Sequence, residues 1–72
     1  MNYAENIRAL REDRDLKQKD IAELLQTTQQ YYSQYETGKR ALPIEHLITL
    51  CKYYNVSADY ILGLPDLPYP KR

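Results

Sequence analysis

The segment from Gln18 to Arg40 constrains the fold more than any other part of the chain, because helical periodicity sorts its second half onto two opposite faces. At about 100° per residue in an α-helix, the amide and hydroxyl groups share one arc: Gln29, Gln30, Ser33 and Gln34. The aromatic groups fall on the opposite wall: Tyr31, Tyr32 and Tyr35. A helix of this kind can anchor its aromatic wall in a core and hold its amides outward. A glutamine amide can pair in bidentate fashion with N6 and N7 of adenine in the major groove.

Length and composition indicate one small globular domain. The chain has 72 residues, of which 43% are hydrophobic and 28% charged, so we expect a modest core and limited stability. The sequence has no long apolar run and no signal-peptide pattern, which predicts a soluble cytoplasmic protein without membrane contact. The single cysteine, Cys51, cannot form an internal disulfide, and no Cys and His cluster has metal-ligand spacing. We therefore expect no cofactor and no metal.

The charge balance is unusual for a nucleic-acid binder, since ten basic and ten acidic residues give a formal net charge of zero. The distribution matters more than the total. Four cations flank the polar helix on its two sides: Lys17, Lys19, Lys39 and Arg40. This arrangement predicts a local positive rim with modest non-specific affinity for nucleic acid.

Capping and stop signals predict an all-α fold of five short helices. The helices are expected at residues 2–14, from 17 or 18 to 25, at about 28–37, from Pro43 to about 54, and at 58–62. Thr27 and Thr28 are both competent N-caps for the third helix, and the pattern does not choose between them. The fourth helix has a wide apolar face: Ile44, Leu47, Ile48, Leu50, Cys51 and Tyr54. Residues 65–72 hold three prolines and are expected to form a non-helical C-terminal tail.

The run QKDIAELLQTTQQYYSQYETGKRALPIEHLITLCKYYNVSADYILGL resembles the phage repressor and Cro type of helix-turn-helix domain. The resemblance covers the chain from Ile7 to Leu64 and includes the TTQQ start of the third helix, its Glu-x-Gly-Lys-Arg ending and the Val-Ser-x-Asp-Tyr-x-Leu-Gly close. It implies a lambda-repressor-like, five-helix DNA-binding domain over residues 1–64. It also implies a homodimer on a palindromic operator.

Two positions depart from the family pattern. Gln26, in the turn, and Asp15, after the first helix, stand where the family often has glycine, because the backbone there tends to a left-handed conformation. A side chain at such a position costs about 1 kcal/mol of strain.

The resemblance also assigns roles to individual residues. The base-contacting candidates are Thr28, Gln29, Gln30, Ser33 and Gln34. The phosphate-contacting candidates are Lys17, Gln18, Lys19, Tyr31, Lys39 and Arg40. Arg11 and Glu36 are expected to form a structural ion pair between the first and third helices. The simpler alternatives are a solvated polar helix face, lysines that serve solubility, and packing for Tyr31.

These assignments lead to one principal hypothesis of function. The chain is expected to be a sequence-specific transcriptional regulator, a repressor, that binds double-stranded DNA as a homodimer with its third helix in the major groove. The expected dimer contacts are Tyr60, Ile61, Leu64 and Leu67, because these apolar groups exceed what a short fifth helix can bury alone.

The sequence bears on two other classes of function. An antitoxin or co-regulator that acts through protein contacts is the alternative, favoured by the zero net charge and the absence of arginine on the third helix. An enzyme is not expected, since no nucleophile–base pair, paired carboxylates or phosphate loop is present. No small-molecule ligand is expected either.

Overall fold

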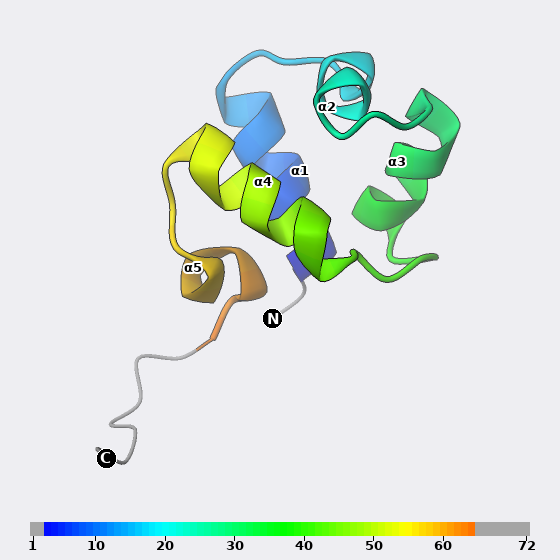
Figure 1. The fold of residues 1–72 in the computed structure, drawn as a ribbon. Coiled ribbons are helices and arrows are strands. Elements are labelled where there is room, and N and C mark those ends of the chain that lie inside the picture. Colours follow the sequence, from blue (N-terminus) through cyan, green and yellow to red (C-terminus); the bar gives the residue numbers. More distant parts are fainter. Residues whose placement is uncertain (1–2, 65–72) are drawn as a thin grey trace, which may run out of the picture.

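The computed structural model describes residues 3–64, and within that range it contains five α-helices and no strand (Figure 1). The helices are α1 (Tyr3–Asp13), α2 (Gln18–Leu24), α3 (Gln29–Thr37), α4 (Ile44–Tyr54) and α5 (Ala58–Leu62). The predicted all-α, five-helix fold is confirmed. The predicted tail at residues 65–72, which includes Leu67, lies outside the described residues. None of the described helices is long and apolar enough to span a membrane.

The helix ends follow local capping chemistry. Thr28 is the N-cap of α3, and its side-chain oxygen accepts a hydrogen bond from the Tyr31 N–H at 3.1 Å. Ser57 caps α5 in the same way through the Tyr60 N–H. The prediction that Pro43 is the first residue of its helix is wrong by one position. Its ψ of 150° is extended, so Pro43 is the N-cap and α4 begins at Ile44.

The two non-glycine residues expected in left-handed conformations do adopt them. Asp15 has a φ of 55° and Gln26 a φ of 58°, and Asn55 at the end of α4 has a φ of 59°. Gln26 therefore makes the turn between α2 and α3 without the conformational freedom of glycine. Gly38 is required for its backbone conformation and not for space. Its φ is 79°, in the left-handed region, although a Cβ there would meet no atom within 4 Å.

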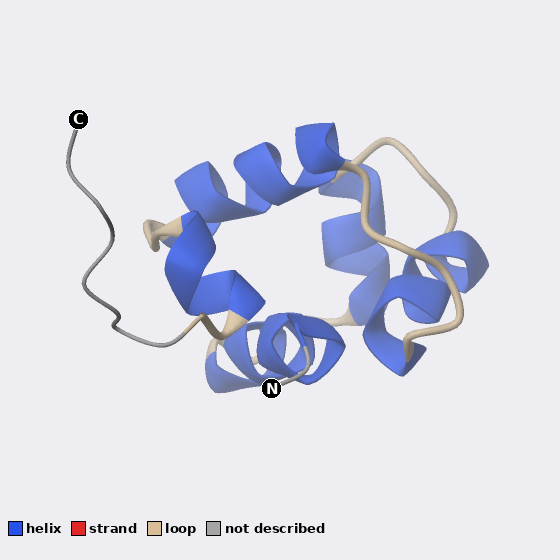
Figure 2. Ribbon diagram, turned by 90° about the horizontal axis from the view of Figure 1, so that it is seen from below, coloured by secondary structure: helices blue, strands red, loops and turns tan. Residues whose placement is uncertain are grey.

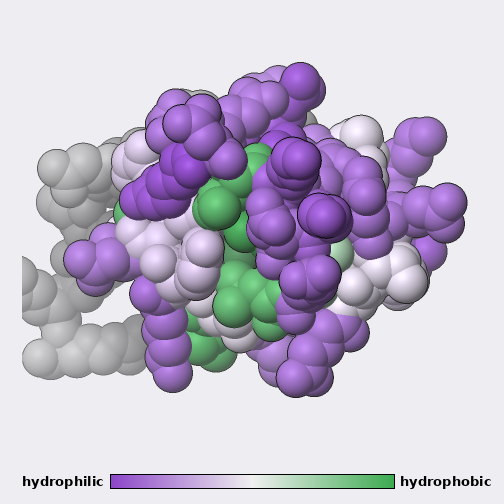
Figure 3. Space-filling view, turned by 90° about the horizontal axis from the view of Figure 1, so that it is seen from above, coloured by the Kyte–Doolittle hydropathy of each residue, from purple (hydrophilic) through white to green (hydrophobic). Residues whose placement is uncertain are grey.

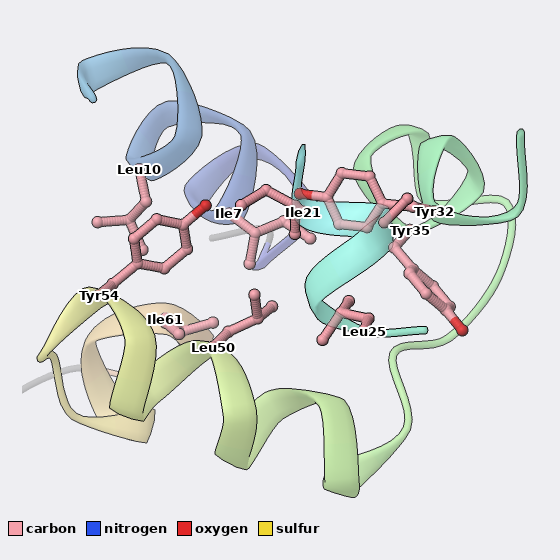
Figure 4. Close-up of a cluster of buried hydrophobic side chains, with 10 residues drawn as sticks. Ile7, Leu10, Ile21, Leu25, Tyr32, Tyr35, Leu50, Tyr54 and Ile61 are labelled. Carbon is pink, nitrogen blue, oxygen red and sulfur yellow. The ribbon is translucent and has the colours of Figure 1, made fainter. Parts of the chain in front are cut away.

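The helices surround a common interior when the molecule is seen from below (Figure 2). Side chains from all five helices fill it, and Ile7, Ile21, Leu50 and Ile61 are completely buried. The Tyr54 ring lies over Leu10 on the side of α1, while Tyr32 points into the centre from α3 (Figure 4). Burial of each large apolar side chain is worth about 1.5–3 kcal/mol, so this cluster is the main source of stability.

Three expectations about apolar residues are corrected by the structure. Ile44 and Ile48 do not join the core face of α4 but are 66% and 49% exposed. They lie away from the direction in which Leu50 and Tyr54 point. Ile61, expected at a dimer interface, has no exposed surface. Successive helical residues lie about 100° apart, so Ile61 turns inward when Tyr60 turns outward.

Side-chain hydrogen bonds tie the ends of the bundle to α1. Asn6 donates from Nδ2 to the carbonyl oxygen of Ile61 at 2.9 Å, which joins α1 to α5. The Tyr3 hydroxyl oxygen accepts from the backbone N–H of Leu42 at 3.0 Å, which holds the loop before α4. Arg14 donates to the carbonyl oxygen of Tyr54 and stacks its guanidinium over the Tyr54 ring. These contacts join segments far apart in sequence, so helical periodicity does not predict them.

Candidate nucleic-acid interface

The outward face of α3 is the surface that the sequence singled out. Thr28, Gln29 and Gln30 are exposed at its start, and Ser33 and Gln34 are half-buried further along. Of the predicted aromatic wall, Tyr32 and Tyr35 are buried, as is Glu36 beside them, whereas Tyr31 is 41% exposed at the boundary. The two-faced pattern of this helix is therefore present in the fold. Because the Thr28 oxygen accepts the capping bond, its hydroxyl proton remains available to an outside acceptor.

A buried carboxylate holds the far end of α3. Glu36 accepts two hydrogen bonds from Arg11, at 2.7 Å from Nε and 3.1 Å from Nη2, and its side chain is only 2% exposed. Arg11 also donates from Nη1 to the carbonyl oxygen of Leu16 at 2.8 Å. Gln18, the first residue of α2, donates from Nε2 to the same carboxylate at 3.0 Å. The Glu36 carboxylate thus fixes the end of α3 to α1 and to the start of α2, and Arg11 extends the link to the α1–α2 loop.

The charge state of this network follows from its contacts. Burial alone raises the pKa of Glu36, but the hydrogen bonds from Arg11 and Gln18, together with the nearby Tyr32 hydroxyl, outweigh it, so the pKa lies below its ordinary value. The hydrogen bond to Glu36 raises the pKa of Arg11 further. Burial and the adjacent carboxylate raise the pKa of Tyr32. The pair is therefore fully ionised at neutral pH, and the Tyr32 hydroxyl stays protonated.

Gln18 has only part of its side-chain amide available for the expected contact with phosphate. Its Nε2 group points toward Glu36, so one of its two amide protons is already used inside the protein. The second proton remains available, together with the free backbone N–H groups at the start of α2. Asp20 takes one backbone donor of this turn, because its carboxylate accepts from the Lys17 N–H at 2.8 Å.

The four cations expected to contact phosphate all lie on the surface: Lys17, Lys19, Lys39 and Arg40. Lys17 and Lys19 lie at the start of α2, and Lys39 and Arg40 follow the end of α3. α3 itself carries one charged side chain, Glu36, which is neutralised by Arg11. No uncompensated acid on α3 therefore opposes an anionic ligand at its outward face.

Arg40 is held by α3 itself. Its guanidinium carbon lies 4.4 Å from the centroid of the Tyr31 ring, and its Nε donates to Oε1 of Gln34 at 3.0 Å. Its backbone N–H also donates to the carbonyl oxygen of Gln34 at 3.2 Å. The Tyr31 ring is 41% exposed and packs edge-on against Tyr35. Sequence reasoning missed this cluster, because a six-residue spacing across a helix end has no periodic signal.

The face that includes α2, at the top of Figure 1, is mostly hydrophilic (Figure 3). Hydrophobic groups are visible there only in a strip through the middle. Within residues 3–64, no three His, Cys, Asp or Glu side chains come together as a possible metal site.

A tight turn between α2 and α3, a polar outward face on α3 and a buried clamp at its end define the class of helix-turn-helix domains. Comparison with known proteins agrees with the geometry. A family model described as Helix-turn-helix matches residues 7–61. The chain belongs to this helix-turn-helix family, of the Cro type.

Three relatives illustrate the similarity. The chain is 38% identical over 69 residues to the uncharacterized HTH-type transcriptional regulator YobD of Bacillus subtilis (strain 168), which covers 96% of this chain and 62% of YobD. It is 33% identical over 60 residues to the uncharacterized HTH-type transcriptional regulator YqaE of the same strain, covering 83% of this chain and 52% of YqaE. The crystal structure of a transcriptional regulator from Listeria innocua superimposes with a TM-score of 0.85 at 32% identity, covering 96% of this chain and 64% of that one. The chain thus spans less than two thirds of the length of each relative.

Proposed function

We propose that this chain is a DNA-binding domain of a transcriptional regulator, with α3 placed in the major groove of an operator. The observation that carries the proposal is the outward row of Gln29, Gln30, Ser33 and Gln34 on a helix whose inner side is clamped through Glu36. A helix held at a fixed angle can present side chains to base edges with little loss of conformational freedom. The names of the relatives, HTH-type transcriptional regulators, support the same conclusion.

Gln29 and Gln30 are the principal base readers. Both are exposed, and within residues 3–64 their side-chain amides make no hydrogen bond, so donor and acceptor are both free. Such an amide can pair with N6 and N7 of adenine, and each good bidentate pair gives about 1–3 kcal/mol of discrimination. Because no Arg or Lys lies on this face of α3, we expect A·T pairs to be preferred at these two positions.

The cations on either side of α3 supply the contacts that carry no sequence information. Lys17 and Lys19 would approach the backbone on one side of the groove, and Lys39 and Arg40 on the other. The zero net charge implies that binding depends on these local cations and not on the overall field. Substituting one phosphate-contacting lysine with alanine should therefore reduce the slope of log K against log salt by about one.

The protein is proposed to act as a homodimeric repressor on an inverted repeat. Tyr60 on α5 is 60% exposed, and Leu64, just after the C-cap Gly63, is 47% exposed. Pairing of this surface with a second copy would bury apolar groups that water now contacts. Two α3 helices would then enter successive major grooves about 34 Å apart.

Selection of bound sequences from a random duplex pool tests the proposal. We expect enriched inverted repeats with A·T pairs facing Gln29 and Gln30. The double variant Gln29→Ala with Gln30→Ala should lose this preference and keep the circular dichroism and melting temperature of the wild type. Lys52→Ala, an exposed change on α4, is the matched control and should leave the selected sequences unchanged. Failure of the wild type to retain any duplex at low salt would refute the proposed function.

A protein-binding role as antitoxin or co-regulator is the second candidate. Ile44 and Ile48 are exposed one helical turn apart on α4, on a surface that the DNA proposal does not use. A strong salt dependence of DNA binding favours the first candidate, because it reports displaced counterions.

A further inference from the structure

The cluster of Arg40, Gln34 and Tyr31 at the end of α3 limits what one of the base readers can recognise. We propose that Arg40 is a positioning residue that turns the Gln34 amide so that its NH2 group, and not its oxygen, faces the DNA. This inference rests on the proposed function, because it concerns how the same face reads sequence. It changes the expected base preference at one position of the operator.

The orientation of the Gln34 amide follows from chemistry. A guanidinium has donors and no acceptor, so the atom that faces Arg40 Nε at 3.0 Å must be the Gln34 oxygen. The amide nitrogen is then directed away from Arg40. Arg40 occupies one of the two lone pairs of this oxygen, so the N6 amino group of an adenine would have to share the same acceptor atom with the guanidinium.

Arg40 is itself held in place by two further contacts. Its guanidinium stacks over the exposed ring of Tyr31, with 4.4 Å between the guanidinium carbon and the ring centroid. Its backbone N–H donates to the Gln34 carbonyl oxygen at 3.2 Å, so the loop after α3 is fixed beside the helix. Both contacts already restrict the side-chain conformations of Arg40 in the free protein, so less conformational entropy is lost when Gln34 binds a base.

The consequence is a difference among the three glutamines of this face. Gln29 and Gln30 retain a free donor and a free acceptor, which suits adenine. Gln34 has a free NH2 group and an oxygen already shared with Arg40, which favours the O6 and N7 acceptors of guanine or the O4 acceptor of thymine over adenine, whose N6 amino group needs that oxygen.

Selection from a random duplex pool, with the wild type and four variants of this chain, tests the inference. In the wild type, guanine or thymine should be preferred over adenine at the base facing Gln34. In Arg40→Ala the freed amide should accept adenine, so this preference should fall by about fivefold to a hundredfold, the range of one base contact. The matched control is Lys39→Ala, which removes the neighbouring surface cation and should weaken binding to all sequences equally.

The other two variants separate positioning from direct contact. If Arg40 acts through Gln34, the effect of Arg40→Ala on preference should vanish when Gln34→Ala is already present. An equal effect in both backgrounds would show that Arg40 reads a base itself, and would overturn the inference. Retention of the wild-type preference by Arg40→Ala would overturn it as well, while leaving the proposed function intact. A wild type without any sequence preference would overturn both.

A measurement on the free protein needs no DNA. The side-chain amide resonances of Gln34 in a 15N-correlated NMR spectrum should shift in Arg40→Ala and stay in place in Lys39→Ala. Unchanged Gln34 resonances in Arg40→Ala would show that the hydrogen bond is absent in solution, and the inference would fall.

Discussion

The two ends of this bundle are held together by different physics. At the α2–α3 end, the buried Glu36 carboxylate accepts two hydrogen bonds from Arg11 and one from Gln18. Each of these bonds weakens steeply when its distance or angle changes. At the α4–α5 end, the buried side chains are Leu50, Tyr54 and Ile61, and the bonds from Asn6 and Arg14 reach backbone carbonyl oxygens and not a buried charge. Apolar packing of this kind tolerates small changes of shape. The polar end carries α3, the helix proposed to contact DNA.

The surfaces of the two ends differ in the same way. α3 exposes amides and a hydroxyl, whereas α4 and α5 expose Ile44, Ile48 and Tyr60. Hydrogen-bonding groups can discriminate between bases, while exposed apolar groups favour association with another protein surface. Within the 62 described residues, exposed hydrogen-bonding groups therefore gather mainly on α3, and exposed aliphatic groups on α4 and after α5. Four predictions test that separation, in order of decreasing effect.

Removal of the cation at the polar end should have the largest effect on stability. Arg11→Ala leaves Glu36 buried and unpaired, so the free energy of unfolding should fall by about 3–5 kcal/mol, measured by urea denaturation. Arg8→Ala is the control, because its exposed bond to Glu12 is an i,i+4 pair worth about 0.3–0.5 kcal/mol. Similar losses from both variants would show that the buried clamp has no special role.

The same network should make stability sensitive to acid. The pKa of Glu36 lies lower in the folded state than its ordinary value of 4.5. Its contribution is therefore present above the unfolded pKa and is lost as pH falls through the folded pKa. The effect should be smaller than that of Arg11→Ala, since a protonated Glu36 still accepts a bond from Arg11. Urea denaturation between pH 7 and 3 checks this, and Glu36→Gln should show a flatter profile over the acid range. An identical profile would contradict it.

The apolar end should tolerate a conservative change. Ile61→Val removes one buried methyl group and should cost about 0.5–1.5 kcal/mol. Leu64→Ala, at a half-exposed position, should change the free energy of unfolding by less than about 0.5 kcal/mol and should weaken dimerisation, measured by analytical ultracentrifugation. The reverse order of stability losses would contradict the assignment of Ile61 to the core and Leu64 to the surface.

The smallest effect concerns the turn of the polar end. Gln26→Gly should raise the free energy of unfolding by up to about 1 kcal/mol, because glycine relieves the left-handed strain at a φ of 58°. Asn55→Gly is the matched change at the apolar end, where φ is 59°. Its gain should be smaller, since asparagine tolerates this conformation better than glutamine. Thermal melts of both variants check the order.

Much of this architecture was predictable because its causes are local. The cap at Ser57, the stop at Gly38 and the left-handed turn at Gln26 depend on residues within one helical turn, whereas the choice of Thr28 over Thr27 as the N-cap of α3 came only from the structure. The two faces of α3 follow from a period that any α-helix imposes. The exact start of α4 was misplaced by one residue, because proline suits both the N-cap and the first helical position.

Contacts between distant segments were less predictable. The Arg11–Glu36 pair was expected from family resemblance alone, and the structure adds the Gln18 bond that shares its carboxylate. The inward turn of Ile61 and the exposure of Ile44 and Ile48 depend on which neighbour each helix packs against. An apolar residue at a face boundary is buried or exposed according to that packing.

The sequence by itself determined that α3 is a helix with glutamines on one side and tyrosines on the other, since periodicity and capping act within a few residues. Only the tertiary structure decided how those glutamines differ from one another. Gln34 is turned by Arg40 across the helix end, whereas Gln29 and Gln30 keep free amides. The reason is that the direction of a hydrogen bond depends on the positions of both partners in space, and the loop after α3 sets one of them.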